Sequence, residues 1–473
     1  MTHSPMAVVW RELGGDPALL PGVSTVARAG ALEARLPVRE SARACVGACA
    51  LAAAELGARR AGLARVPRVS VDDGAVATAF VSERHLRIDG RAPVSFAPLS
   101  RFWRTADGWV RTHANYPHHR ARLLDALGAA DDATAEDVAG VLAGRSAREV
   151  EETVYAAGGL AVALRTAKEW AVHEQALALA GRPLTDWDRP SERGEPATAG
   201  ARALAPLRDG PPLSPAAGVR VLDLTRVIAG PVATRTLALL GADVLRVDGP
   251  RLPEDPDAHA DTGFGKRSAV LDLVADRRTF DELLATADVV VTGYRPGALD
   301  RFGLSPEALA EGNPGLVVAQ VSAWGTYGPW GGRRGFDSLV QVATGIATAE
   351  GSPERPGALP AQALDHGTGY LLAAAVLRAL TEREEHGRGC VVRLALARTA
   401  MWLTDGIGRD EAPGALPDPV PSAPYGRPDP WLSERNSPFG LLGHALPPVS
   451  FTGGPTDWSR PPGLWGTDPA RWA

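Results

Sequence analysis

From residue 219 onward, short continuous apolar runs alternate with longer segments that carry apolar residues on one side only. Apolar runs of four to seven residues are typical of strands buried on both faces of a parallel sheet. Strands that alternate with helices in this way indicate a doubly wound α/β fold. The expected strands are 219–225, 243–247, 268–273, 289–291 and 316–321, and the expected helices are 231–240, 276–287 and a short one that opens at Ser305.

The first half contains a faint copy of one unit of the second half. Residues 36–62 and 359–387 both run Leu-Pro, an Ala/Leu-rich helix, a charged end and a Gly, and a short β-branched strand follows each. We therefore expect one repeated helix–strand unit. A stretch rich in Pro, Gly and charge at 182–218 predicts a linker between the halves, and the Pro-rich residues 411–473 predict an irregular tail.

Length and composition narrow the class of protein. With about 150 residues per domain as a guide, 473 residues predict about three units. A net charge of −5 argues against a nucleic-acid or anionic-membrane partner, since both require a basic excess. The longest apolar runs, 44–54 and 369–377, fall short of the ~20 residues of a membrane span, and no signal peptide is evident.

Three cysteines are too few for a disulfide framework, so we expect a cytoplasmic protein. Cys45 and Cys49 share a helix face, but no second Cys or His pair completes a metal site, and we interpret them as small buried residues. No metal ligands are assigned.

The turn at 225–231 and the loop at 263–268 are candidate ligand contacts. In the turn, the small residues Ala229 and Gly230 precede a helix whose N-terminus suits a phosphate, although the junction by itself favours an ordinary tight turn. The loop resembles a phosphate loop but lacks the Walker spacing, so nucleotide hydrolysis is excluded. Lys266 is one of only two lysines, which indicates either a site that needs a compact ammonium or a solvated surface residue.

The helix that begins near Asp365 carries the main candidate for covalent chemistry. An Asp that opens an apolar helix is most simply an N-cap, but a carboxylate can also serve as a covalent nucleophile. His113, His118 and His119 surround Tyr116-Pro117, and we interpret them as surface or hydrogen-bonded groups that matter only if their domain closes over Asp365.

Six blocks follow one another in the order found in family III CoA-transferases, the formyl-CoA and carnitine type, which this chain closely resembles. They are 219–250, 263–273, 287–309, 313–330, 335–345 and 363–377. The resemblance implies a Rossmann-like large domain with a parallel sheet plus a smaller α+β domain. It suggests a rearranged order: a degenerate large-domain fragment at 1–95, the small domain at 96–181, the linker at 182–218, the CoA-binding large domain at 219–410 and the tail at 411–473.

The resemblance also implies an activity. In that family, an aspartate attacks an acyl-CoA thioester to give a mixed anhydride, then becomes an aspartyl-CoA thioester, and finally passes CoA to a carboxylic acid. Asp365 matches this nucleophile. The matching CoA contacts are Val227, Ile228, Ala229, Lys266, Tyr294, Arg301 and Arg334. The expected enzyme is a CoA-transferase with coenzyme A and acyl-CoA as substrates, a carboxylic acid as partner, no tightly bound cofactor and a possible homodimer.

Several positions depart from the family pattern. Gly249 stands where many members have a phosphate-binding Arg, for which Arg251 is a candidate substitute, and the glycine-rich shielding loop has no match. The aspartate slot of the N-terminal copy falls near residues 40–42, so no second active site is expected. Racemase relatives carry Gly-His-Asp, but this chain has Phe336 in place of the His. A phenylalanine side chain cannot transfer a proton. A 2-methylacyl-CoA racemase and a catalytically inactive CoA-binding scaffold remain the alternatives.

Overall fold

A computed structural model describes residues 4–93, 96–189, 202–207, 210, 212–407 and 420–473. The helices are α1 (Pro5–Glu12), α2 (Val38–Arg60), α3 (Asp73–Ala79), α4 (Ser82–His85), α5 (Pro117–Leu127), α6 (Ala135–Ala143), α7 (Ala147–Ala156), α8 (Ala167–Ala171), α9 (Glu174–Ala180), α10 (Ala229–Leu239), α11 (Pro256–Thr262), α12 (Arg277–Leu284), α13 (Pro306–Gly312), α14 (Asp337–Ala343), α15 (Ile346–Ala349), α16 (Ala363–His386) and α17 (Leu396–Met401). The strands are β1 (Val23–Ala27), β2 (Val69–Asp72), β3 (Arg87–Ile88), β4 (Phe102–Arg104), β5 (Trp109–Thr112), β6 (Ala161–Ala163), β7 (Asp186–Asp188), β8 (Arg220–Leu224), β9 (Asp243–Asp248), β10 (Arg267–Val270), β11 (Val289–Thr292), β12 (Val317–Ser322), β13 (Cys390–Ala395), β14 (Val420–Pro421), β15 (Leu432–Ser437) and β16 (Gly440–Ala445).

The largest sheet has the strand order β10-β9-β8-β11-β12-β13-β7. The first six strands are parallel, and their order is that of a Rossmann fold. Every residue of β11 and β12 is buried, as their continuous apolar runs predict. The α/β fold and the five expected strands are therefore confirmed, with ends that differ by up to three residues.

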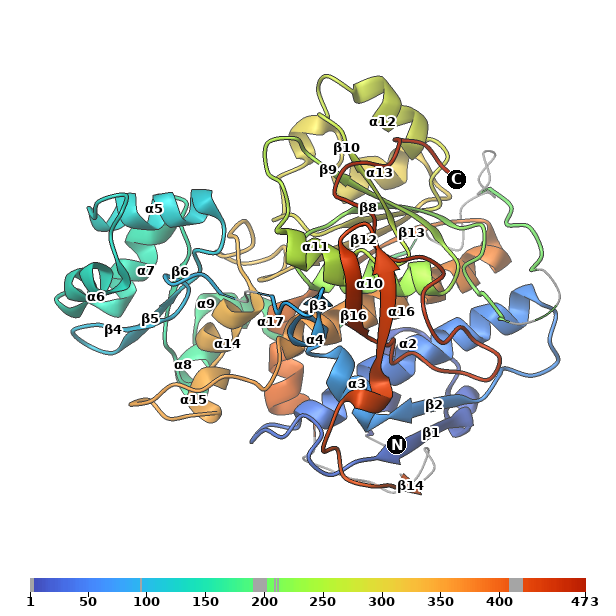
Figure 1. The fold of residues 1–473 in the computed structure, drawn as a ribbon, viewed down its shortest axis with the longest axis horizontal. Helices are drawn as coiled ribbons and strands as arrows, with labels where there is room; N and C mark the ends of the chain where they lie inside the picture. The colour runs from blue at the N-terminus through green and yellow to red at the C-terminus, as the bar shows by residue number, and fades with distance from the viewer. Residues whose placement is uncertain (1–3, 94–95, 190–201, 208–209, 211, 408–419) are drawn as a thin grey trace.

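Successive side chains of a strand point to opposite sides of the sheet. Because the side chains on both sides are mostly apolar here, helices cover both faces. Leu222 of β8 joins a cluster with Phe280 of α12 and Leu309 of α13. Val221, its neighbour, faces the main core, which includes Val232 of α10. Figure 1 shows α12 and α13 on one side of the sheet and α10 and α16 on the other.

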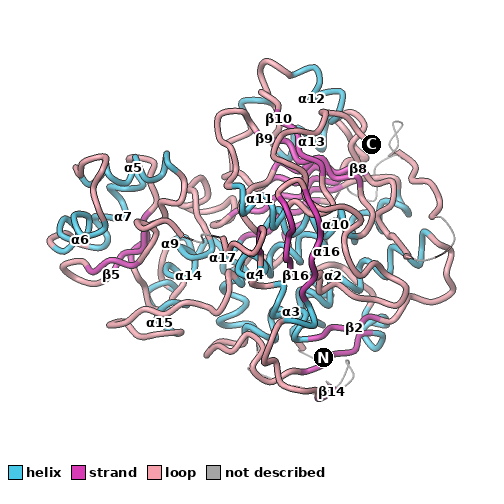
Figure 2. The backbone as a smooth tube through the Cα atoms, in the orientation of Figure 1, coloured by secondary structure: helices cyan, strands magenta, loops and turns pink. Residues whose placement is uncertain are grey.

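Helix α16 is the centre of the main core and packs between α2 and α10. Residues 36–62 form α2, followed by β2, just as α16 is followed by β13, so the helix–strand succession expected of the repeat is present in both halves. The N-terminal unit belongs to a separate parallel sheet, β14-β1-β2, visible as short strands in Figure 2. By length and composition alone α2 also qualifies as a membrane span, but 89% of its most apolar window is buried inside the fold.

The small lobe is an antiparallel sheet, β4-β5-β6, packed on α5, α6 and α7 around its own apolar core. It projects from the large lobe at the left of Figure 1. The predicted small domain also includes α8 and α9, but Trp170 and Leu179 from these helices belong to the main core. The segment after the small lobe therefore anchors it to the large lobe.

The predicted linker and tail are more ordered than expected. In the linker, β7 adds an antiparallel edge strand to the large sheet. In the tail, β15 and β16 form a hairpin that pairs with β3, and Thr467 bridges to Ala269 at the opposite edge of the large sheet. Hydrogen bonding to existing strands gives these weakly apolar segments a fixed position. Residues 190–201 of the linker and 408–419 at the start of the tail lie outside the described residues.

Candidate active site

A cavity of about 650 Å³ opens where β8 and β11 end, at the point where the strand order reverses. Ligands of doubly wound sheets bind at this switch point, beyond the carboxyl ends of the strands. The cavity lies between the two lobes. The expected residues that line it are Val227, Ala229, Tyr294, Arg301, Arg334 and Asp365.

Asp365 lies in the first turn of α16, and its side chain is buried, with the residue only 6% exposed. It lines the cavity, and its carboxylate has no hydrogen-bond or ion-pair partner among the described residues. Burial raises the pKa of Asp365 well above its usual range, and the neighbouring carboxylates of Asp337 and Glu83 raise it further. The group is therefore uncommitted to the fold and accessible from the cavity.

The N-cap explanation of Asp365 is wrong, because Asp337 caps α16 instead. Gln362 is the N-cap residue, and its side chain makes no capping bond. Oδ2 of Asp337 accepts the backbone N–H groups of Leu364 and Asp365, each at 2.9 Å. Asp337 is itself buried, which raises its pKa to about 6. By satisfying the end of α16, Asp337 leaves the carboxylate of Asp365 free.

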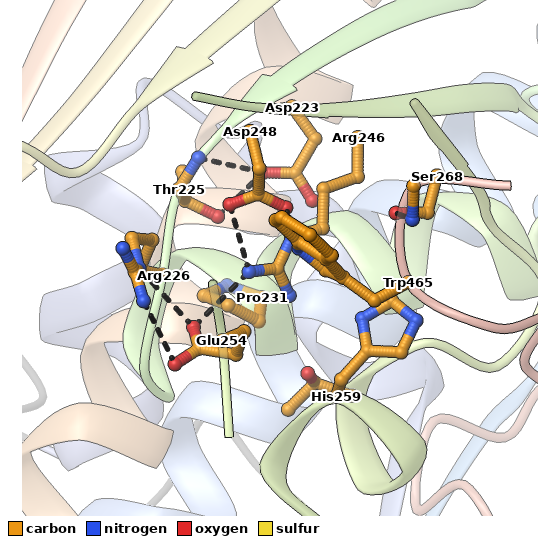
Figure 3. A network of polar contacts seen from close by, with 12 residues as sticks. Asp223, Thr225, Arg226, Pro231, Arg246, Asp248, Glu254, His259, Ser268 and Trp465 are labelled. Atoms are coloured by element: carbon orange, nitrogen blue, oxygen red, sulfur yellow. Dashed lines mark hydrogen bonds and ion pairs between the residues drawn. The ribbon is translucent and has the colours of Figure 1, made fainter. Parts of the chain in front are cut away.

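The turn between β8 and α10 has a strained backbone. Val227 adopts φ = 73°, a left-handed conformation that is rare for a β-branched residue. Its N–H donates to Glu254 at 3.3 Å, and Arg226 pairs with the same carboxylate at 3.3 Å (Figure 3). Arg226 also donates to the carbonyls of Leu252 and Pro253. Hydrogen bonds to the 252–254 segment therefore stabilise a backbone conformation that the turn residues do not favour by themselves.

Glu254 connects this turn to the sheet and to the small lobe. It accepts a hydrogen bond from Arg246 at 3.0 Å, as Figure 3 shows, and one from the hydroxyl of Tyr116 in the small lobe at 2.7 Å. Burial raises the pKa of Glu254, but Arg246 and Arg226 outweigh this effect and lower it to about 2. Glu254 is therefore ionised and joins the two lobes beside the cavity.

Unpaired arginines surround the cavity. The guanidinium groups of four lining residues have no hydrogen-bond or ion-pair partner among the described residues: Arg251, Arg295, Arg301 and Arg334. Gly249 also lines the cavity two residues before Arg251. Guanidinium groups bind phosphates through paired N–H donors, so this wall suits a polyanion.

Lys266 and Ile228 differ from expectation because neither lines the cavity. Lys266 is 3% exposed, pairs with Asp223 at 3.0 Å and donates to the carbonyl of Pro231 at 3.1 Å. Burial lowers the pKa of Lys266 to about 8, and Asp223 opposes that shift. Lys266 is thus not a surface residue and does not line the cavity, and its ammonium connects β8 to the first turn of α10.

The histidine cluster of the small lobe is also different from the sequence interpretation. His113 and His119 are buried, and both ring nitrogens of His113 and Nδ1 of His119 have no hydrogen-bond partner. His118, His119 and Tyr116 line the same cavity as Asp365. The small lobe therefore closes over Asp365, the condition under which these residues were expected to matter.

Sequence reasoning missed Glu254, Asp337 and the cavity role of Arg226 and Arg295. Two of these had a visible signal, since Arg226 and Arg295 follow within three residues of the ends of the apolar strands β8 and β11. Glu254 and Asp337 had none, because each acts on a backbone segment far from it in the sequence. The 40–42 segment of the N-terminal copy lies in the first turn of α2 and does not line the cavity.

Within the described part of the chain, no group of three or more His, Cys, Asp or Glu side chains could hold a metal ion. Cys45, Cys49 and Cys390 are free and buried there. Burial raises the pKa of each thiol, so none is an activated nucleophile.

Comparison with known proteins agrees with this geometry. Residues 216–430 match the family described as CoA-transferase family III. The chain is 35% identical over 233 residues to a probable fatty acyl-CoA transferase, Rv3272, of Mycobacterium tuberculosis, which covers 45% of this chain and 59% of that protein. It is 35% identical over 207 residues to the succinyl-CoA–L-malate CoA-transferase beta subunit of Chloroflexus aurantiacus, covering 40% and 51% of the two. It is 34% identical over 200 residues to the formyl-CoA:oxalate CoA-transferase of Streptomyces coelicolor, covering 39% and 48%.

The chain therefore spans between 48% and 59% of the length of these three relatives. The matched region, 216–430, contains the parallel strands β8 to β13 and the helix of Asp365, which are the parts that form the floor of the cavity. The similarity of this chain to CoA-transferase family III therefore rests on residues 216–430.

Proposed function

We propose that the protein transfers CoA from an acyl-CoA thioester to a carboxylic acid, with Asp365 as the nucleophile. The observation that carries this proposal is a carboxylate without a partner in the same cavity as four unpaired guanidinium groups. The cavity thus combines guanidinium groups that suit the phosphates of CoA with a carboxylate that can attack a thioester.

In the proposed reaction, a carboxylate oxygen of Asp365 attacks the thioester carbonyl, and CoA leaves as a thiolate. The thiolate then attacks the aspartyl carbonyl of the mixed anhydride, which releases the donor acid and leaves an aspartyl-CoA thioester. The acceptor carboxylate attacks that thioester, and the returning thiolate takes the new acyl group and restores Asp365. Each step exchanges one activated acyl group for another, so the reaction requires that water be excluded.

The surroundings of Asp365 support this use of the side chain. Its raised pKa means that burial favours the protonated carboxyl group more than water does, and the reactive anion forms as the pH rises. An anion in a buried site is poorly solvated and has no hydrogen bond to lose before it attacks. Small residues on the facing turn, Ala229 and Gly230, leave room for the thioester arm.

The unpaired arginines support recognition of the CoA nucleotide. Val227, Ala229 and Tyr294 line the cavity together with Arg251, Arg301 and Arg334, and we propose these residues as CoA contacts. Arg251 would supply the positive charge that is missing at Gly249. We propose that the cavity is complete within one chain, because both lobes contribute to its walls; a homodimer remains compatible with this arrangement.

The first test is to trap the covalent intermediate. Incubation with an acyl-CoA followed by hydroxylamine, which converts an activated aspartyl group into a hydroxamate, should label Asp365 alone. Asp365→Asn should abolish labelling and reduce CoA transfer by at least about a thousandfold, because the variant has no nucleophile. Peptide mass spectrometry locates the label. CoA binding by calorimetry should remain, because the arginines are unchanged.

Asp281→Asn is the matched control, since Asp281 is an exposed carboxylate on α12 that pairs with Arg277 outside the cavity. It should label and turn over like the wild type. Full transfer activity in Asp365→Asn would refute the covalent mechanism. CoA binding by the wild type without any label or transfer would instead indicate a binding scaffold, and solvent deuterium at the α-carbon without CoA exchange would indicate a racemase.

A further inference from the structure

His119 is a buried side chain whose polar atoms the fold does not fully use. It lies in the first turns of α5, is 4% exposed and lines the cavity. Its ring packs against those of His118, with ring centroids at 4.1 Å, and Tyr116, at 5.5 Å. Its Nδ1 has no hydrogen-bond partner. Its Nε2 has no hydrogen-bond partner among the described residues either, so this nitrogen can still bind a ligand in the cavity that the residue lines.

A short chain of contacts connects His119 to Asp365. The ring of His119 meets Phe336 edge-on, with centroids 5.9 Å apart. Phe336 directly precedes Asp337, whose Oδ2 holds the N–H of Asp365 at 2.9 Å. His119, Phe336 and Asp365 all line the same cavity. The small lobe therefore contributes an imidazole to the same cavity to which the large lobe contributes the carboxylate.

The imidazole is neutral at the pH at which such enzymes work. Burial lowers the pKa of His119 to about 3, and the positive charge of nearby Arg334, Arg122 and Arg226 acts in the same direction, as does His118. A neutral imidazole keeps one N–H donor and has little tendency to give up that proton. It is suited to stabilise negative charge through a hydrogen bond and poorly suited to deliver a proton.

We propose that His119 is a catalytic residue that donates a hydrogen bond to the acyl carbonyl oxygen while Asp365 attacks. This inference rests on the proposed function. As the Asp365 oxygen bonds to the carbonyl carbon, the carbonyl π electrons move onto the oxygen, and the N–H of His119 binds the resulting oxyanion. When the tetrahedral adduct collapses, the electrons return, the carbon–sulfur bond breaks and CoA leaves as the thiolate. His119 keeps its proton throughout.

This role also explains the position of Phe336, which occupies the place of the histidine in racemase relatives. His113 also stacks on Phe336, with the two ring centroids 3.7 Å apart. The phenyl ring is thus held in contact with two histidines of the small lobe and cannot itself donate. The donor comes from the small lobe, so the reactive arrangement exists only when the two lobes are together.

The test compares two variants at His119 in the full-length chain. His119→Phe keeps a flat ring but removes the N–H, and His119→Gln keeps an N–H donor without a titratable ring. The measured quantity is the single-turnover rate of Asp365 labelling with an acyl-CoA and hydroxylamine, with the dissociation constant for CoA as a second readout. We expect His119→Phe to label about a hundred- to a thousandfold more slowly, the loss typical of one oxyanion donor. We expect His119→Gln to label at least about ten times faster than His119→Phe. The dissociation constant for CoA should be unchanged in both variants.

If His119→Phe does not fold, His119→Ala replaces it, and added imidazole should restore its labelling rate. Labelling by His119→Phe at the wild-type rate would overturn the inference, as would the absence of rescue by Gln and by imidazole. Solvent deuterium entering the acyl α-carbon in a His119-dependent manner would also overturn it, because His119 would then be a proton-transfer group. Failure of the wild type to form any Asp365 adduct would refute the proposed function itself.

Discussion

At the scale of single residues, the site depends on two neighbouring carboxylates with different tasks. The carboxylate of Asp337 accepts hydrogen bonds from the N-terminus of α16 and from Gln341. The carboxylate of Asp365 has no hydrogen-bond partner among the described residues. A buried carboxylate without hydrogen bonds favours its neutral form, because burial penalises the charge. Ionisation of Asp365 in this site therefore costs more free energy than it does in water, and the resulting carboxylate is more reactive because it is poorly solvated.

This cost predicts that Asp365→Asn stabilises the protein as the pH rises. The folded-state pKa of Asp365 lies well above the ordinary value of 3.8, so the stability that its protonated form contributes is present in full below about pH 4 and is lost as the pH rises through the folded-state pKa. The loss is about 1.4 kcal/mol for each pH unit between the two pKa values. An amide does not titrate, and the variant should therefore exceed the wild type in melting temperature by more at pH 8 than at pH 5. Equal differences at both pH values would show that Asp365 is not a destabilising anion.

At the scale of elements, the position of Asp365 depends on how closely α16 approaches α10. A Cβ at Gly369 would lie 2.6 Å from the carbonyl oxygen of Ala229 and 2.9 Å from Val232. Ala229 is also a residue of the cavity wall. Gly369 is thus the point at which the nucleophile helix touches the proposed CoA turn, and the absence of a side chain there fixes their separation.

Two glycines of α16 provide a matched comparison. Gly369→Ala should destabilise the protein by about 1–3 kcal/mol, the usual cost of overpacking, and should weaken CoA binding because α16 moves away from the turn. Gly367→Ala should be neutral or stabilising by up to about 1 kcal/mol, since its Cβ would meet Cys45 Sγ at an ordinary 3.5 Å and Ala favours a helix. Denaturant unfolding and CoA calorimetry measure both effects. Similar stability losses in the two variants would contradict this explanation.

At the scale of the whole molecule, the cavity exists because three distant parts of the chain meet. The small lobe brings Tyr116 and His119, and the large lobe brings Asp365 and the arginines. The C-terminal tail supports the floor from behind: Trp465 donates to Asp248 at 3.0 Å, and Asp468 accepts the N–H of Ser268 at 2.8 Å (Figure 3 shows Trp465 beside Asp248). The tail covers the β10 edge, which would otherwise expose unpaired backbone groups.

The hydroxyl of Tyr116 is the direct link between the small lobe and the strained turn, through Glu254. Tyr116→Phe should raise the KM for acyl-CoA about tenfold, which corresponds to about 1.4 kcal/mol, the lower end for a hydrogen bond to a charged group. The tightly paired Glu254 remains satisfied by its arginines, so the fold should persist. Steady-state kinetics and thermal melting report the two effects separately.

Tyr327→Phe is the control for this prediction. The hydroxyl of Tyr327 also donates to a carboxylate, that of Asp186 at 2.8 Å, but neither residue lines the cavity. We expect Tyr327→Phe to change the melting temperature about as much as Tyr116→Phe does and to leave the KM for acyl-CoA unchanged. An equal rise in KM for both variants would mean that Tyr116 acts through general stability rather than through the approach of the lobes.

The parallel sheet was predictable because its information is local. A run such as 289–291 is apolar at every position, and only burial on both faces accommodates it, so the strands and their helices could be assigned from the pattern alone. Asp365 and the proposed CoA contacts were assigned through the resemblance to a known family, and their roles remain predictions. The hairpin β15–β16 and the edge strand β7 were not predictable, because their stability comes from pairing with strands elsewhere.

What the sequence determined by itself was the layered α/β architecture, and its resemblance to a known family named the candidate site residues. What only the tertiary structure decided was which of those residues are free to act. Lys266 forms an ion pair with Asp223. Asp337 caps the helix of Asp365, so the carboxylate of Asp365 does not have to, and His119 lines the cavity from the small lobe. The reason is physical: a side chain's chemistry depends on its burial and on its partners, and these partners lie 43 and 28 positions away in the first two cases, a distance that no local pattern spans.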